Sequence, residues 1–74
     1  MLVEVRLFAT FREGRFKSRQ VELAQGTCPA DILAQLEIPQ NQVGILLVNG
    51  RDKPLEYCLT QDDVVSIFPA LGGG

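Results

Sequence analysis

The sequence of 74 residues contains no histidine and no tryptophan, and its only cysteines are Cys28 and Cys58. The two cysteines lack the C-x-x-C spacing, so the composition excludes the usual zinc and iron–sulfur sites and any Cys–His nucleophile pair. We therefore expect no metal site. We expect both thiols to be reduced and partly buried, as small apolar residues in a reducing compartment.

Long apolar runs are also missing. No segment approaches the ~20 consecutive apolar residues of a membrane-spanning helix, and Glu4 and Arg6 interrupt the N-terminus too early for a signal peptide. The formal net charge is only −2, and four of the seven cations lie between residues 12 and 19, as expected of a solvated hairpin. The sequence thus predicts a cytoplasmic protein that binds neither membranes nor nucleic acid.

What is present indicates one small folded domain. Apolar residues make up 46% of the chain, which is normal for a globular protein. A domain of this size has little room for a deep catalytic cleft, and the chain has no phosphate-binding glycine loop. We therefore expect a folded domain over residues 1–70, a flexible glycine tail over residues 71–74, and catalytic groups that come from other proteins.

Four segments have the alternation or the apolar character of β-strands: residues 2–9, 16–23, 43–48 and 64–68. In the first segment Val3, Val5, Leu7 and Ala9 share one face, and the second segment is its predicted hairpin partner. One helix is predicted between the second and third segments. These elements predict an α+β roll, in which one mixed sheet of four to five strands packs on one main helix.

Local signals place the ends of these elements. Thr27 is the natural N-cap of the helix, Pro29 lies in its first turn, and the dipeptide Ile38-Pro39 ends it. A tight turn follows the third strand at Asn49-Gly50, because both residue types tolerate positive φ. The acidic pair Asp62-Asp63 predicts a solvated turn before the last strand.

The sequence ends in Leu71 followed by Gly72, Gly73 and Gly74. A glycine tail adds no packing and is the most expensive kind of sequence to order. A slim chain without Cβ atoms can, however, enter a narrow site on another protein. We therefore expect the C-terminal carboxylate of Gly74 to be the reactive group.

An apolar docking patch is predicted beside this tail. Phe8 shares its strand face with Glu4 and Arg6, and Phe68 shares its face with Ser66, so both rings are expected on the outward side of the sheet. Leu46 and Leu71 are expected to join them. Burying one such side chain is worth ~1.5–3 kcal/mol, against ~3–6 kcal/mol for ordering three glycines. The alternative is that the rings cover the sheet edge or pack under the loop of residues 12–17.

The sequence contains the segments Val5-Arg6-Leu7-Phe8-Ala9, Phe11-Arg12-Glu13, Gly26-Thr27, Asp31-Ile32-Leu33, Leu47-Val48-Asn49-Gly50, Leu59 with Asp62-Asp63-Val64, and Ile67-Phe68-Pro69 before the glycines. Taken together, these segments resemble the MoaD/ThiS sulfur-carrier family over essentially the whole chain. Among the carriers, the Phe8-Ala9 and Phe68-Pro69 pairs are most similar to the small subunit of molybdopterin synthase, whereas a third terminal glycine is more typical of thiamine-type carriers.

The resemblance implies a ubiquitin-like β-grasp fold and a role as a protein co-substrate. An E1-like enzyme would adenylate the Gly74 carboxylate with ATP, and a sulfur donor would displace AMP to leave a thiocarboxylate. The tail would then deliver sulfur to a larger partner, such as the large subunit of molybdopterin synthase, in molybdenum- or tungsten-cofactor biosynthesis. The chain itself would bind no cofactor. Three alternatives stay open: a thiamine-type carrier, a protein modifier conjugated through Gly74, and a plain β-grasp interaction module.

Overall fold

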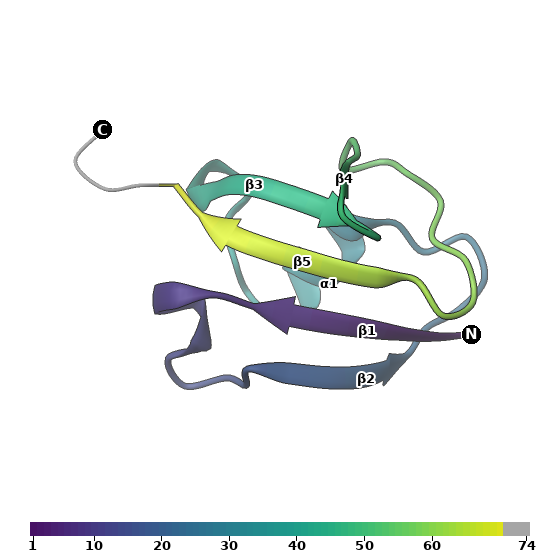
Figure 1. The fold of residues 1–74 in the computed structure, drawn as a ribbon, viewed down its shortest axis with the longest axis horizontal. Coiled ribbons are helices and arrows are strands. Elements are labelled where there is room, and N and C mark those ends of the chain that lie inside the picture. The colour runs from purple at the N-terminus through teal and green to yellow at the C-terminus, as the bar shows by residue number, and fades with distance from the viewer. Residues whose placement is uncertain (71–74) are drawn as a thin grey trace.

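The computed structural model describes residues 1–70, which form one five-stranded sheet, one α-helix and two 3-10 helices (Figure 1). The helix α1 spans Pro29–Gln35, and the 3-10 helices are η1 (Ala9–Arg12) and η2 (Gln40–Gln42). None of the helices in this range is long and apolar enough to span a membrane. The strands are β1 (Leu2–Leu7), β2 (Ser18–Glu22), β3 (Val43–Val48), β4 (Arg51–Asp52) and β5 (Val64–Pro69).

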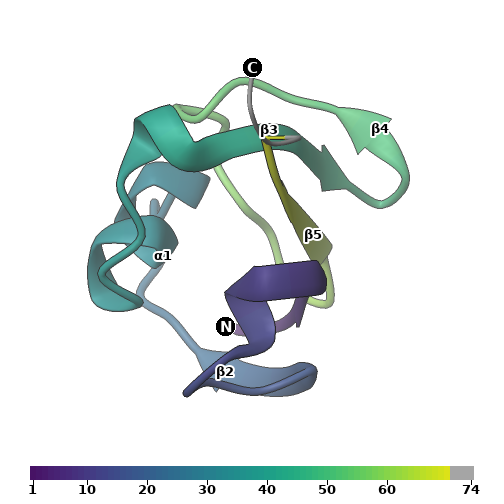
Figure 2. The same cartoon turned by 90° about the vertical axis from the view of Figure 1, so that its left-hand side faces the viewer.

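The sheet has the strand order β2-β1-β5-β3-β4, so the first and last strands of the chain lie side by side. β1 and β5 are parallel, whereas the three other pairs are antiparallel. This is the mixed sheet that the sequence predicted. Figure 2 shows that the sheet curves and that α1 lies on its concave side.

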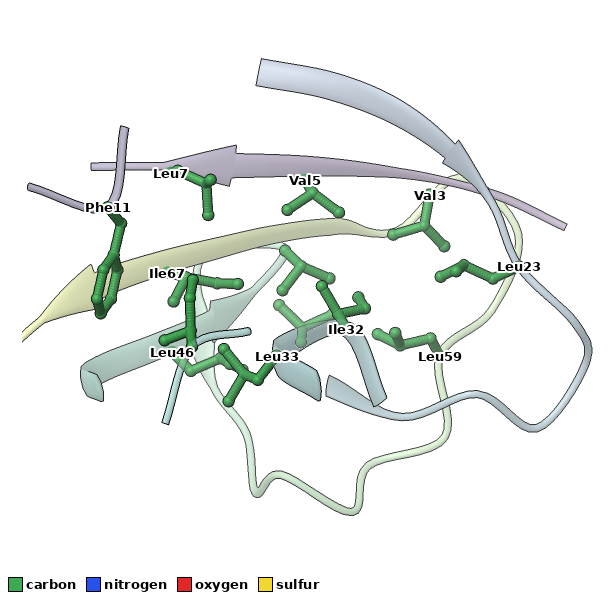
Figure 3. Packing of buried hydrophobic residues seen from close by; sticks show 13 residues of the cluster. Val3, Val5, Leu7, Phe11, Leu23, Ile32, Leu33, Leu46, Leu59 and Ile67 are labelled. Atoms are coloured by element: carbon green, nitrogen blue, oxygen red, sulfur yellow. The ribbon is translucent and has the colours of Figure 1, made fainter. Parts of the chain in front are cut away.

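The apolar core lies between the sheet and α1 (Figure 3). The alternation in β1 correctly predicted its inward face, since Val3, Val5 and Leu7 are fully buried. A helix of only seven residues is too short to be stable alone in water. It is held by its buried residues Ile32 and Leu33, whose burial contributes ~1.5–3 kcal/mol each.

The first hairpin is shorter than predicted. β1 ends at Leu7 because Ala9 adopts a positive φ of 51° and begins η1, so Ala9 is exposed instead of sharing the core face. The chain returns to the sheet at Ser18, two residues later than predicted. Phe8 is still tied to β5, because its N–H donates to the Ile67 carbonyl at 3.2 Å.

The helix N-cap is Cys28 rather than Thr27. The Thr27 hydroxyl donates backwards to the Ala24 carbonyl at 2.7 Å, so it is not available to the helix. The N–H of Cys28 donates instead to the Asp31 carboxylate at 3.1 Å. At the other end the helix stops at Gln35, before the predicted Ile38-Pro39, because Glu37 adopts a φ of 58°.

One of the two cysteines also differs from expectation. Cys28 is half-buried, but Cys58 is exposed. Cys58 lies in the irregular segment between β4 and β5, where its neighbour Leu59 points into the core with 2% of its surface exposed. Since Leu59 anchors this segment, the thiol next to it faces solvent.

The predicted turn at Asn49-Gly50 is confirmed, with φ values of 54° and 81°. The prediction that Asp62-Asp63 is a solvated turn is wrong for Asp63, which is 5% exposed. Its carboxylate accepts hydrogen bonds of 2.8 Å from the Asn49 amide and from the Thr60 N–H. The buried carboxylate of Asp63 therefore links the β3–β4 turn to the start of β5 by hydrogen bonds.

Candidate functional site

Phe8 and Phe68 form a stacked pair on the side of the sheet away from α1. Their ring centroids are 4.1 Å apart and the ring planes differ by 11°. The parallel pairing of Leu7 with Ile67 places the two following residues next to each other. Leu7 and Ile67 are fully buried, so Phe8 and Phe68 alternate to the opposite face, where both rings are half-buried. This is the outward placement that strand parity predicted.

The prediction that Leu46 belongs to this surface is wrong. Leu46 is 5% exposed and pairs in register with Ile67, so its side chain lies in the core. Its neighbour Ile45 pairs with Phe68 and is 51% exposed. Phe8, Phe68 and Ile45 therefore make up an outer apolar patch across three adjacent strands. The burial of Val48 fixes the parity of β3 and places Ile45 on the outer face, but the sequence alone does not show which parity is buried.

Basic side chains flank one edge of the outer apolar patch. The Arg12 guanidinium carbon lies 5.3 Å from the centroid of the Phe8 ring, and Arg12 Nε donates to the Leu7 carbonyl at 2.7 Å. A cation over an aromatic face contributes ~0.5–1 kcal/mol at an exposed site. A shallow pocket beside Phe8 also includes Lys17 and the ion pair of Arg6 with Glu4, so the excess positive charge comes from Arg12 and Lys17. A partner that covers the patch therefore meets positive charge on the β1 side.

The end of β5 lies next to this patch and leads to the glycine tail. The Ala70 N–H donates to the Gln42 carbonyl at 2.8 Å, and Pro69 pairs in register with Val43. The chain is thus held to the beginning of β3 up to its last described residue. The predicted tail residues Leu71, Gly72, Gly73 and Gly74 lie outside the described residues.

Asp63 is a buried carboxylate that lies away from the outer apolar patch. Within residues 1–70, no group of three or more His, Cys, Asp or Glu side chains could hold a metal ion. Burial raises the pKa of Asp63, but hydrogen bonds from the Thr60 backbone, the Asn49 amide and the Thr60 hydroxyl outweigh burial and lower this pKa. Asp63 precedes β5, whereas the outer apolar patch and Ala70 lie at the strand's far end. Asp63 is therefore a structural group.

Comparison with known proteins decides the family, because the family model of the ThiS family matches residues 5–74. The chain belongs to the ThiS family. No curated protein matches it. Among solved structures, the HVO 2177 protein of Haloferax volcanii is 32% identical, with a TM-score of 0.81 over 100% of this chain and 87% of that chain.

Two further structures carry names from molybdopterin chemistry. A candidate molybdopterin converting factor subunit 1 of Pyrococcus furiosus is 25% identical, with a TM-score of 0.78 over 96% of this chain and 99% of that chain. The complex of subunits 1 and 2 of the molybdopterin-converting factor of Helicobacter pylori contains a chain that is 24% identical, with a TM-score of 0.67 over 100% of both chains. That last likeness shows the fold alone.

The resemblance to the MoaD/ThiS sulfur-carrier family, inferred from short segments, is thus confirmed. The ubiquitin-like β-grasp fold is confirmed as well, with five strands and one α-helix in the part of the chain that the structure describes. This ThiS-family protein is a small ubiquitin-like sulfur carrier, built around a sheet whose outward face bears the outer apolar patch.

Proposed function

We propose that the carboxylate of Gly74 is the sulfur-carrying group. An E1-like enzyme binds ATP, and a carboxylate oxygen attacks the α-phosphate, which releases pyrophosphate and leaves an acyl-adenylate. A hydrosulfide from the sulfur donor then attacks the acyl carbon, so that a C–S bond forms, the bond to AMP breaks, and a thiocarboxylate remains. The chain supplies the acyl group, and the enzymes supply the catalytic residues.

The placement of Ala70 carries this proposal. Ala70 is exposed and lies at the end of β5, the strand that also bears Phe68. Five residues from Ala70 to Gly74 extend at most ~17 Å, which is enough to enter a partner's active site from the domain surface. A body held together up to Ala70 and followed in sequence by Leu71 and three glycines suits a protein whose terminal atoms react inside other enzymes.

The outer apolar patch is the surface that we propose for partner binding. Docking has to offset the ~3–6 kcal/mol needed to order three glycines, and covering the surface that the half-buried Phe8 and Phe68 still expose contributes ~0.5–1 kcal/mol each, at ~25 cal/mol per Å². We expect Ile45 and Leu71 to add to this surface. The structure from Helicobacter pylori is a complex of subunit 1 with subunit 2, which supports a larger sulfur-acceptor subunit as the partner here.

For the pathway, we propose molybdopterin synthesis. The candidate converting-factor subunit of Pyrococcus furiosus covers 96% of this chain at 25% identity, and the Phe8-Ala9 and Phe68-Pro69 pairs point the same way. Gly72 provides one more residue than a two-glycine tail, which adds at most ~3.6 Å of reach. Transfer of sulfur to a pterin precursor rather than to a thiazole precursor, in parallel reactions, tests this assignment.

The proposed chemistry is tested by intact mass spectrometry after incubation with ATP, the E1-like enzyme and sulfide. The expected product has one oxygen atom replaced by sulfur. A matched chain lacking Gly73 and Gly74 keeps the folded body and should stay unmodified. Absence of the thiocarboxylate with an active E1-like enzyme would overturn the proposal, and a ladder of isopeptide adducts on other proteins would identify a modifier instead.

A further inference from the structure

Gly44 is the extra residue of a bulge where β3 meets the end of β5. Val43 pairs with Pro69 and Ile45 pairs with Phe68, so two steps along β3 face one step along β5. Such a bulge bends its strand and re-aims the chain beside it. Figure 1 shows the start of β3 alongside the end of β5, where the chain leaves the sheet.

Space, rather than backbone conformation, requires glycine at this position. The glycines with positive φ in the described range are Gly14, Gly26 and Gly50. A Cβ added to Gly44 would lie 2.8 Å from the Ala70 Cα and 2.9 Å from the Pro69 carbonyl oxygen. These are backbone atoms, which cannot rotate away as a side chain would. The Pro69–Ala70 peptide therefore rests directly on the bare Cα of Gly44.

A hydrogen bond fixes the same peptide from its other end. The Ala70 N–H donates to the Gln42 carbonyl at 2.8 Å. Gln42 is the last residue of η2, and its own N–H donates to the Pro39 carbonyl at 3.0 Å, so a short helical turn holds this acceptor in place. Gly44 and the Gln42 carbonyl thus form a seat for Ala70.

We propose that this seat sets the direction in which the chain leaves Ala70, and that Gly44 is a positioning residue for activation of the C-terminus. The role rests on the proposed function. Gly72, Gly73 and Gly74 have no side chains that could restrict the path of the chain, so its conformations are best limited before them, at Ala70. If Ala70 is freed from these contacts, each productive encounter with the enzyme must order one more residue, at a cost of roughly 1–2 kcal/mol. This cost corresponds to a ~5- to 30-fold loss in the rate of adenylation.

The test compares Gly44→Ala with Gly50→Ala in the full chain. At Gly44 the added methyl group displaces Ala70, whereas Gly50 has a φ of 81° and open space around it, so alanine there strains a distant turn only. Hydrogen exchange of the Ala70 amide measures directly whether its N–H stays bonded to the Gln42 carbonyl. Steady-state kinetics of adenylation with the E1-like enzyme report its effect on activation.

We expect Gly44→Ala to lose protection at the Ala70 amide and to lower kcat ~5- to 30-fold with little change in KM, because the outer apolar patch still docks. Gly50→Ala should leave both readouts unchanged. If the Ala70 amide of folded Gly44→Ala is still protected from exchange, Gly44 does not hold Ala70 in place. If the amide loses protection but kcat is normal, Gly44 has no positioning role.

A second variant covers the case in which Gly44→Ala does not fold. Ala70→Pro removes the N–H that binds the Gln42 carbonyl and changes no residue of β3. It should lower kcat in the same range, and unchanged kinetics would contradict the proposal. If the wild-type chain is never adenylated, the proposed function fails, and the positioning role fails with it. Amide exchange then still shows whether the seat exists.

Discussion

The side-chain amide of Asn49 donates a 2.8 Å hydrogen bond to the buried carboxylate of Asp63, while its oxygen accepts the N–H of Val64 at 2.9 Å. One side chain thus ties the β3–β4 turn to the first residue of β5. The backbone adds to this link, since the Asn49 N–H donates to the Val64 carbonyl at 2.8 Å. The strand that leads to the tail is fastened at its start by Asn49 and at its end by the Gln42 carbonyl.

Replacing Asp63 by asparagine should lower the free energy of unfolding by about 1–3 kcal/mol, because a charged acceptor is lost and a buried amide donor faces the Asn49 and Thr60 donors. Urea denaturation measures this loss. Asp62→Asn is the matched control at an exposed neighbour and should change stability by less than about 0.5 kcal/mol. Equal losses in both variants would contradict the role assigned to Asp63.

The same carboxylate should make stability depend on acid. Its pKa is lower in the folded state than the ordinary value of 3.8, so folding favours the ionised form. The contribution is therefore complete above pH of about 5, where the unfolded chain is also ionised, and is lost as the pH falls through the folded-state pKa. The free energy of unfolding, measured between pH 6 and 2, should fall less steeply in Asp63→Asn than in the wild type. Parallel curves would exclude this linkage.

Adjacent residues of β3 should separate partner binding from folding. Leu46→Ala removes a core side chain and should cost about 2–5 kcal/mol of stability. Ile45→Ala removes an exposed side chain of the outer apolar patch, so it should weaken binding to the acceptor subunit with less than about 1 kcal/mol lost in folding. Calorimetric titration and urea unfolding of both variants make the comparison. The assignment of Ile45 fails if its variant binds normally.

The stacked phenylalanines should add to the docking energy that the more exposed Ile45 supplies. Phe68→Ala should raise the Kd for the acceptor subunit ~2- to 5-fold, as expected from ~0.5–1 kcal/mol for covering the surface that the half-buried ring still exposes. Loss of the stack with Phe8 also lowers stability by about 0.5–1.5 kcal/mol, so binding is compared at a temperature where both proteins are folded. Arg51→Ala, on exposed β4 away from the patch, serves as the control and should bind like the wild type.

Strand periodicity predicted the inward face of β1 and the outward position of both phenylalanines, because alternation is a local property of an extended chain. It failed for Leu46, since every residue from Val43 to Val48 except Gly44 is apolar and the run does not show which parity faces the helix. The bulge at Gly44 breaks the count further, and only the pairing with β5 reveals it.

The hydrogen bond between Asn49 and Asp63 could not be predicted from the sequence for a different reason. Asn49 and Asp63 lie 14 residues apart, and each residue alone has the usual signature of a solvated turn. Their hydrogen bond exists only because β3 and β5 are neighbours in the sheet. Cys58 was misjudged in the same way, since its exposure follows from which of its neighbours anchors the segment after β4.

The position of β5 between β1 and β3 has a consequence for synthesis on the ribosome. A nascent chain that has not yet extruded its final strand lacks the middle of the sheet, and both halves expose unpaired edges to chaperones and proteases. Insertion of β5 completes the sheet through contacts between strands that are far apart in sequence, so this step comes late in folding. Truncated translation products should therefore be degraded, and cells would keep carriers whose last strand has been made.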